Sequence, residues 1–324
     1  MNPLKIRLLS FITVVFTIFP GHSIFAADKQ ECKLYEVLDI ELTFTKAKDP
    51  FGLVLKGQFT GPNNEKLEIP GFYNGEGKYI IRFSPVASGT WKYITLSSEP
   101  KLSGKSGEVI CKASEGNNHG AMVIDPENPK RFSYQDGTPY FLSAFEFDWL
   151  FALDLDNPDD IPRTRKIIDR LAENGFNHIV MNVYAEDVSW QKDPDLKDKH
   201  EFAQPGIFPF MGSNSEPDFS VLNVEFFKRL DRVIGLLAEK NIIAHLMIYV
   251  WNKEVNWPEM YTDEDNMYFD YVIKRYQAFP NIIWDISKEA LSYGRCDMDY
   301  VNERIERVRR NDAYKRLLTV HYYG

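Results

Sequence analysis

The alternation of hydrophobic and polar residues along the chain changes in kind near residue 115. Between residues 34 and 112, apolar side chains recur at every second position, as at Leu38, Ile40, Leu42 and Phe44. Turn-forming sequences such as Gly61-Pro62-Asn63-Asn64 separate these short runs. Short alternating runs between regular turns are typical of antiparallel sheets packed face to face. They predict a small β-sandwich of immunoglobulin type over residues 28–115.

Residues 116–143 are predicted to form a linker and a β-hairpin. The segments 131–134 and 138–141 flank Gln135-Asp136-Gly137, and an Asp-Gly pair suits the positive φ angles of a tight turn. Such a hairpin could close the bottom of a barrel.

From residue 144 to residue 324 the pattern is one of repeated strand, loop and helix units. Apolar runs predict strands over 142–147, 176–184, 242–251, 281–286 and 317–322. Apolar residues at helical spacing predict helices over 161–174, over 224–240, from about residue 262, and over 299–311. Repeated units of this kind predict a parallel sheet, as either a doubly wound sheet or a (β/α)8 barrel. A complete barrel takes about 250 residues and eight strands, so the five strands predict the N-terminal part of one.

Charge and composition narrow the classes of partner. The formal net charge of −9 opposes binding to a nucleic-acid backbone or to an anionic membrane surface. Aromatic residues make up 14% of the chain. Most aromatic rings fill protein cores, but flat apolar rings also pack against sugars. The charge gives no support to a nucleic-acid partner, and the aromatic content is only a weak pointer to an oligo- or polysaccharide.

The N-terminal residues 1–27 are predicted to be a signal peptide. Lys5 and Arg7 precede an apolar run from Leu8 to Phe19, and the small residues Ala26-Ala27 suit a cleavage site. The apolar run is short for a membrane span, and no cysteine follows it that could carry a lipid anchor. We expect a secreted or periplasmic protein without a membrane anchor.

Export makes the three cysteines interpretable. Cys32 and Cys111 bracket the predicted sandwich, whereas Cys296 lies far away. In an oxidising compartment we expect a disulfide between Cys32 and Cys111 and a thiol at Cys296. The absence of a CxxC spacing gives no reason to expect a zinc site, and we expect no metal and no cofactor.

The candidate chemistry lies where the predicted strands end. The run Pro280–Ile286 stops at Lys288 and Glu289, and the C-terminal ends of barrel strands form the active site in α/β barrels. Glu289 is therefore the candidate catalytic residue, although its carboxylate could instead cap a helix or pair with a surface cation. The other strand ends supply candidate substrate-binding residues: Asp148, Trp149, Asn182, Tyr184, Trp251, Asn252, Lys288, His321 and Tyr323.

Each of these side chains has a structural explanation when it is taken singly. The tryptophans could pack at the core or rim, Asp148 could cap a helix, and His321 could be an internal hydrogen-bonded histidine. Their recurrence at the same end of five successive strands favours a binding site. The sequence contains no G-x-S-x-G turn and no Gly-rich loop after a strand, so it gives no support to a serine hydrolase or a phosphate-binding enzyme.

The chain resembles secreted bacterial proteins that join an immunoglobulin-like N-terminal domain of unknown function to an apiosidase-like barrel of glycoside hydrolase clan A. In the N-terminal part, the resemblance rests on Gly71–Gly75, Ile81–Pro85 and Gly89–Tyr93. In the barrel, it rests on the segments Phe132–Pro139, Asp148-Trp149, Asn174–Asn177 and Pro280–Glu289.

The resemblance implies a role for Glu289 as general acid/base. It also implies a nucleophilic carboxylate on a seventh strand, which this chain does not reach. Lys288 stands where much of the clan has an asparagine that holds a sugar hydroxyl, and His321 to Tyr323 resembles a fifth-strand pair of cellulase-like barrels. Retaining hydrolysis needs two carboxyl groups about 5 Å apart. We therefore expect a truncated barrel that is inactive by itself.

Two functions follow as hypotheses. The first is a secreted glycoside hydrolase-like protein that acts on polysaccharide, with Trp149 and Trp251 as aromatic walls and Asn182 and His321 as hydrogen-bonding groups. The alternative is a non-catalytic carbohydrate-binding or adhesion protein, in which the same strand ends bind glycan without cleaving it.

Overall fold

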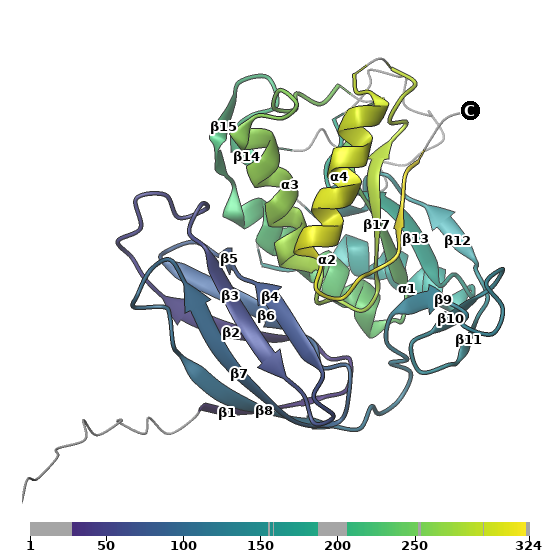
Figure 1. Ribbon diagram of the computed structural model, residues 1–324. Coiled ribbons are helices and arrows are strands. Elements are labelled where there is room, and N and C mark those ends of the chain that lie inside the picture. The colour runs from purple at the N-terminus through teal and green to yellow at the C-terminus, as the bar shows by residue number, and fades with distance from the viewer. Residues whose placement is uncertain are drawn as a thin grey trace, which may run out of the picture.

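The computed structural model describes residues 28–154, 156–157, 159–186, 206–251, 254–293 and 295–321 (Figure 1). The predicted signal peptide, Asn252 and Tyr323 lie outside these residues. The described part comprises a unit made mostly of strands, followed by a unit in which strands and helices alternate (Figure 1).

The N-terminal unit is a sandwich of two sheets. One sheet has the order β1 (Asp28–Lys33), β8 (Ser106–Lys112), β7 (Gly89–Ser97), β3 (Leu55–Thr60) and β4 (Lys66–Pro70). The other has the order β2 (Leu38–Thr43), β6 (Lys78–Phe83) and β5 (Phe72–Tyr73). Both sheets contribute aromatic rings to one core, in which Phe59 stacks on Phe83 at 4.2 Å and Trp91 meets Phe83 edge-on. The alternation seen in the sequence thus marks the faces turned toward this core.

The first strand of the sandwich, β1, is not among the predicted strands. Its sequence is Asp-Lys-Gln-Glu-Cys-Lys, which has few residues that favour a strand locally. It forms because it pairs in parallel with β8, and this register sets Cys32 opposite Cys111. Neighbouring strands lie about 4.8 Å apart, within the range that a disulfide can span. Both sulfurs are buried thiols in this structure, and the disulfide stays a prediction.

The alternating unit contains a five-stranded parallel sheet. Its order is β12 (Ala144–Glu146), β13 (His178–Asn182), β16 (Ile243–Val250), β17 (Ile282–Lys288) and β18 (Leu318–Thr319). The five strands therefore lie in the sheet in the same order as in the chain. A doubly wound sheet instead reverses its strand order at a switch point. This order is consistent with part of a barrel.

The helices lie where the apolar spacing predicts them, to within two residues. They are α1 (Pro162–Glu173), α2 (Val224–Glu239), α3 (Asp263–Tyr276) and α4 (Met298–Asn311), with a short 3-10 helix η1 (Leu150–Ala152) after β12. The segment before α2 contains an antiparallel hairpin of β14 (Phe210–Gly212) and β15 (Pro217–Leu222). None of the helices in the described ranges is long and apolar enough to cross a bilayer.

A small sheet closes the N-terminal end of the parallel strands. It consists of β9 (Met122–Ile124), β10 (Phe132–Tyr134) and β11 (Pro139–Tyr140). Met122 and Tyr140 form a buried cluster with Ile243 and Ile283, which stand near the starts of β16 and β17. The predicted hairpin therefore lies at the bottom of the parallel sheet.

A buried network of charges joins the sandwich to the helices. Arg82 on β6 donates to Asp39 at 2.8 and 2.9 Å and to Asp231 on α2 at 3.1 Å. Arg275 on α3 donates to the same Asp231 at 2.8 and 2.7 Å. Both guanidinium groups also lie over the ring of Phe72. Burial favours the neutral form of Asp231, but Arg275 and Arg82 outweigh it and lower the pKa of this carboxyl.

Candidate active site

The carboxyl ends of β12 and β17 meet through one lysine. Lys288 is the last residue of β17, and its Nζ donates to Glu146 Oε1 at 2.5 Å and to the two Asp148 oxygens at 2.9 and 2.8 Å. Two other strands lie between β12 and β17, so a flat sheet would hold them roughly 14 Å apart. Side chains stand roughly perpendicular to a sheet, so these contacts indicate that the sheet curves around its C-terminal edge.

The charges of this cluster stabilise one another. Burial favours the neutral form of Glu146, but the hydrogen bond and the charge of Lys288 outweigh it and lower the pKa of Glu146. Burial likewise disfavours the charged form of Lys288, but Asp148 and Glu146 outweigh it and raise the pKa of the ammonium group. At neutral pH Glu146 is therefore a carboxylate held by a buried cation.

Glu289 stands at the turn directly after β17. Its φ angle is +54°, a conformation that residues other than glycine rarely adopt and that is common at functional sites. The turn is tied to the end of the sheet because Ala290 N donates to His321 O at 3.2 Å. The Glu289 side chain is half-buried, and its carboxylate has no hydrogen bond or ion pair with any described residue.

Three buried polar groups at the strand ends have no hydrogen-bond partner within the described ranges. They are both amide atoms of Asn182, the Oγ of Ser287 and the Nε1 of Trp251. Asn182 ends β13, Trp251 follows β16, and Ser287 precedes Lys288 on β17. A buried polar group without a partner costs about 1–3 kcal/mol. Such groups are uncommon in native proteins, and these three lie at the C-terminal edge of the sheet, whereas others are spread over the rest of the described residues.

Two aromatic candidates, Tyr184 and Trp251, are buried by packing. Tyr184 is fully buried, and its hydroxyl donates to Glu186. Burial, followed by the contact with Glu186, raises the pKa of Tyr184. Trp251 is only 5% exposed, with Tyr249 stacked on its ring and the Arg295 guanidinium 5.3 Å from the ring centre. Their rings are used in packing, so the aromatic-wall role does not fit Trp251 in this arrangement.

The remaining candidates lie at the edge of the site. Trp149 is half-buried and lines a shallow cavity of about 390 Å³ with Glu146, Asp148 and two phenylalanines. His321 is also half-buried and lies near enough to Glu146 for its charge to help lower the pKa of that carboxyl.

A chain of polar side chains inside the sheet is absent from the predictions. The Tyr140 hydroxyl lies 3.1 Å from His178 Nδ1, His178 Nε2 lies 3.2 Å from His245 Nδ1, and His245 Nε2 lies 3.0 Å from Asp285 Oδ2. Asp285 also accepts from the backbone N–H of His321 at 3.0 Å. Burial, and then the charge of His245, lowers the pKa of His178 to about 4. The available signal was the presence of polar residues inside otherwise apolar strands.

The described residues hold no group of three or more His, Cys, Asp or Glu side chains placed to bind a metal ion. The polar groups at the described strand ends include carboxylates, an ammonium group, an amide, hydroxyls and an indole N–H.

Two family models match the chain. Residues 126–323, more than half of the chain, match the model described as "Apiosidase-like, catalytic domain". Residues 31–98 match a domain of unknown function, DUF5060. A search of curated proteins finds no match.

Among solved structures, a candidate glycoside hydrolase from Bacteroides vulgatus ATCC 8482 is similar over 91% of this chain and 56% of its own, with 25% identity and a TM-score of 0.76. This chain thus spans little more than half the length of that protein. A family 5 glycoside hydrolase from the same organism matches with 18% identity and a TM-score of 0.41, covering 64% of this chain and 40% of its own. A family 5 mannosidase from Rhizomucor miehei matches with 16% identity and a TM-score of 0.43, covering 64% and 57%. The last two scores are too low to support an argument.

Proposed function

Because the chain belongs to the family of apiosidase-like catalytic domains, we propose that it is a retaining, clan A type glycoside hydrolase-like protein that acts on an oligo- or polysaccharide. In this proposal Glu289 is the general acid/base. The second carboxylate, the nucleophile, belongs to a later strand of the complete barrel.

The observation that carries the proposal is the difference between Glu289 and its acidic neighbours. Lys288 binds Glu146 and Asp148, and the lowered pKa of Glu146 keeps that group ionised. A carboxylate held in this way is a poor proton donor. The Glu289 carboxylate has no such partner in the described part of the chain, and it stands at the C-terminal end of the fourth of the five parallel strands. It can therefore approach a glycosidic oxygen and exchange a proton with it.

Sugar hydroxyls would complete the hydrogen bonds that the strand ends leave open. The Asn182 amide offers two donors and one acceptor, and Ser287 offers a hydroxyl. Lys288 occupies the position of an asparagine in related enzymes, but Glu146 and Asp148 engage its ammonium group. We therefore assign the contact with a sugar hydroxyl to Asn182 rather than to Lys288.

The test is Glu289→Gln in a polypeptide that supplies the complete barrel. Hydrolysis of a natural glycan should fall by about 10²–10⁴-fold, because the glutamine cannot protonate the leaving oxygen. Aryl glycosides with good leaving groups need little protonation, so their bond-cleaving step should slow much less. Glu146→Gln is the matched control, which should change both classes of substrate to a similar degree.

Equal hydrolysis of natural glycans by wild type and Glu289→Gln would make Glu289 a structural carboxylate. Glycan binding without turnover by the wild type would instead favour the alternative, a non-catalytic carbohydrate-binding protein.

We also propose that the protein is secreted or periplasmic, and that Cys32 and Cys111 form a disulfide there. Burial raises the pKa of Cys32 to about 12 and that of Cys111 to about 11, so oxidation is expected before or during closure of the sandwich. Peptide mapping under non-reducing conditions should recover the two cysteines in one linked peptide pair. Recovery of both as thiols from exported protein would contradict the proposal.

A further inference from the structure

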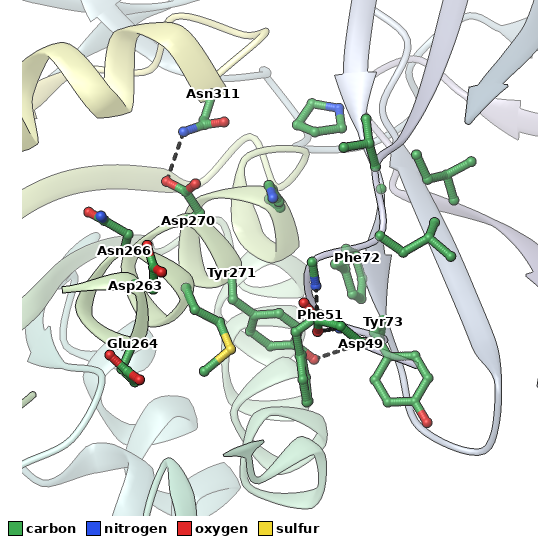
Figure 2. A pocket seen from close by; sticks show the side chains of 18 of the residues that line it. Asp49, Phe51, Phe72, Tyr73, Asp263, Glu264, Asn266, Asp270, Tyr271 and Asn311 are labelled. Atoms are coloured by element: carbon green, nitrogen blue, oxygen red, sulfur yellow. Dashed lines mark hydrogen bonds between the residues drawn. The ribbon is translucent and has the colours of Figure 1, made fainter. Parts of the chain in front are cut away.

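A second cleft lies between the sandwich and the helices, and none of the strand-end candidates lines it. Its volume is about 590 Å³. One wall comes from the loop before β3 and from the β4–β5 segment, and the other comes from α3 with part of α4 (Figure 2). Two units that are separate in the sequence thus enclose one space.

Aromatic side chains from both units meet in this cleft. Phe51 of the sandwich lies edge-on to Tyr73 at 5.2 Å and to Tyr271 of α3 at 5.8 Å, as Figure 2 shows. The Tyr271 hydroxyl donates to the Tyr73 carbonyl at 2.7 Å. These contacts hold the rings in place across the boundary and leave a half-buried apolar surface at Phe51.

One lysine in the cleft makes no direct contact with a carboxylate of the described residues. Lys274 is half-buried and has no hydrogen bond or ion pair with any residue in the described ranges. Asp270 lies one helical turn before it but is already bound by Arg307 at 2.6 and 3.1 Å and by Asn311 at 2.9 Å. The other lining lysine, Lys56, is paired with Glu68 at 2.6 Å.

The surroundings of Lys274 make its charge unfavourable. Burial lowers the pKa of Lys274; the charges of Arg307 and Lys56 act in the same direction, and Asp270 opposes them. The attraction of an anion bound at this point would offset both the repulsion and the cost of desolvating the ammonium group.

The carboxylates of the cleft do not occupy that place. Asp49 accepts from the backbone N–H groups of Phe51 and Gly52 at 3.1 and 2.9 Å. Asp263 and Glu264 belong to the first turn of α3, nearly three turns before Lys274, and Figure 2 shows them away from Asn311. The charges of Arg307, Lys56 and Asp270 all act on Lys274. An anion at Lys274 would therefore lie among two cations and one carboxylate that Arg307 already binds, in a cleft that Phe51 and Tyr271 also line.

We propose that this cleft is an accessory binding site for a sugar unit that carries a carboxylate or a sulfate. Lys274 binds the anionic group, and the ring of Phe51 packs against the apolar face of the sugar. The choice of a sugar rests on the proposed function, whereas the need for an anion rests on the charges in the cleft alone.

Calorimetric titration tests the proposal with three probes. They are an oligogalacturonide, its methyl ester, which is neutral, and a sulfated galactan oligosaccharide. We expect at least one of the two acidic probes to bind and the methyl ester to fail. Binding of the oligogalacturonide alone identifies a carboxylate, and binding of the sulfated probe alone identifies a sulfate.

Variants then locate the binding. Lys274→Met keeps the aliphatic stem and should weaken binding about tenfold or more, because a hydrogen bond between charged groups is lost. Lys274→Arg should retain binding, which separates loss of charge from misfolding. Lys92→Met is the matched control, because this lysine is 72% exposed on the sandwich and far from α3 in the chain.

Two results would overturn the inference. One is the failure of both acidic probes to bind wild-type protein. The other is an affinity for the acidic probe that is the same in Lys274→Met as in Lys92→Met. Glu289 does not line the cleft, so Glu289→Gln should bind the acidic probes as tightly as wild type does. A lack of glycan hydrolysis would therefore count against the proposed function but not against binding in the cleft.

Discussion

Two of the charged clusters among the described residues differ in how their groups are paired. At the boundary between the units, Arg82 and Arg275 share Asp231. Arg82 also binds Asp39, and its remaining donor reaches the carbonyl of Arg275 at 3.1 Å. At the strand ends, Lys288 holds two carboxylates, and Glu289 beside it has no partner among the described residues.

The difference separates a cluster that serves structure from one that is suited to a ligand. A network in which every donor and acceptor is satisfied holds its elements in one arrangement. A site for a ligand has to keep groups without protein partners, at a cost in stability, and Asn182 and Ser287 meet that description. We therefore expect substitutions of paired groups such as Asp231 and Lys288 to affect stability, and substitutions of groups without partners such as Glu289 to affect mainly chemistry.

The largest effect on stability is expected for Asp231→Asn. Without the carboxylate, two buried guanidinium groups face each other with only Asp39 as a counterion. Breaking a buried ion pair from one side costs about 3–5 kcal/mol. The free energy of unfolding, measured in urea, should show this loss.

The control variant is Glu68→Gln. It breaks a pair whose side chains are nearly half exposed and should cost less than about 1 kcal/mol. Similar losses in the two variants would mean that the boundary network contributes no more to stability than a surface ion pair.

Acid is expected to lower the stability by a somewhat smaller amount, because the buried His178 resists protonation. The pKa of His178 is lowered to about 4 in the folded protein, below its ordinary value of about 6.5. The stability that the neutral ring contributes is therefore present above about pH 6.5 and is lost as the pH falls toward about 4. The loss should reach about 3 kcal/mol.

The measurement is the urea midpoint as a function of pH between 7 and 4. His178→Gln should flatten this acid limb, whereas His119→Gln, at a more exposed position, should leave it in place. An unchanged acid limb in His178→Gln would assign the loss to other groups.

The smallest of the three effects is expected for Lys288→Met. The variant leaves Glu146 and Asp148 without their cation, but the Glu146 side chain is 49% exposed, so the loss should be about 2 kcal/mol at pH 7. The pKa of Glu146 is lowered in the folded protein. The stabilisation is therefore present at pH values above the ordinary pKa of a glutamate and is lost as the pH falls through the lowered pKa of the folded state. The difference from wild type should therefore shrink toward pH 3. A difference that does not change with pH would indicate lost packing of the lysine stem instead.

The sequence by itself determined the elements whose pattern is local. The helices α1 and α2 follow from apolar residues at helical spacing, and the observed ends differ from the predicted ones by at most one residue. Local pattern also placed Asn182 and Glu289 near strand ends, although the strands predicted to end at Tyr184 and Ile286 end at Asn182 and Lys288. The strand β1 was missed because its own residues do not favour a strand, and only the pairing with β8 holds it.

The tertiary structure decided which groups at the strand ends have partners. Lys288 bonds to Glu146, which lies 142 positions away in the chain, and Arg82 meets Asp231 across 149 positions. No periodicity carries information over such distances. Packing likewise buried Tyr184 and Trp251, because side-chain exposure depends on neighbours from other segments, such as Phe226 of α2 beside Tyr184 and Tyr300 of α4 beside Trp251. A local pattern places a residue at the edge of a sheet, but only the fold determines whether its charge is neutralised there or left for a ligand.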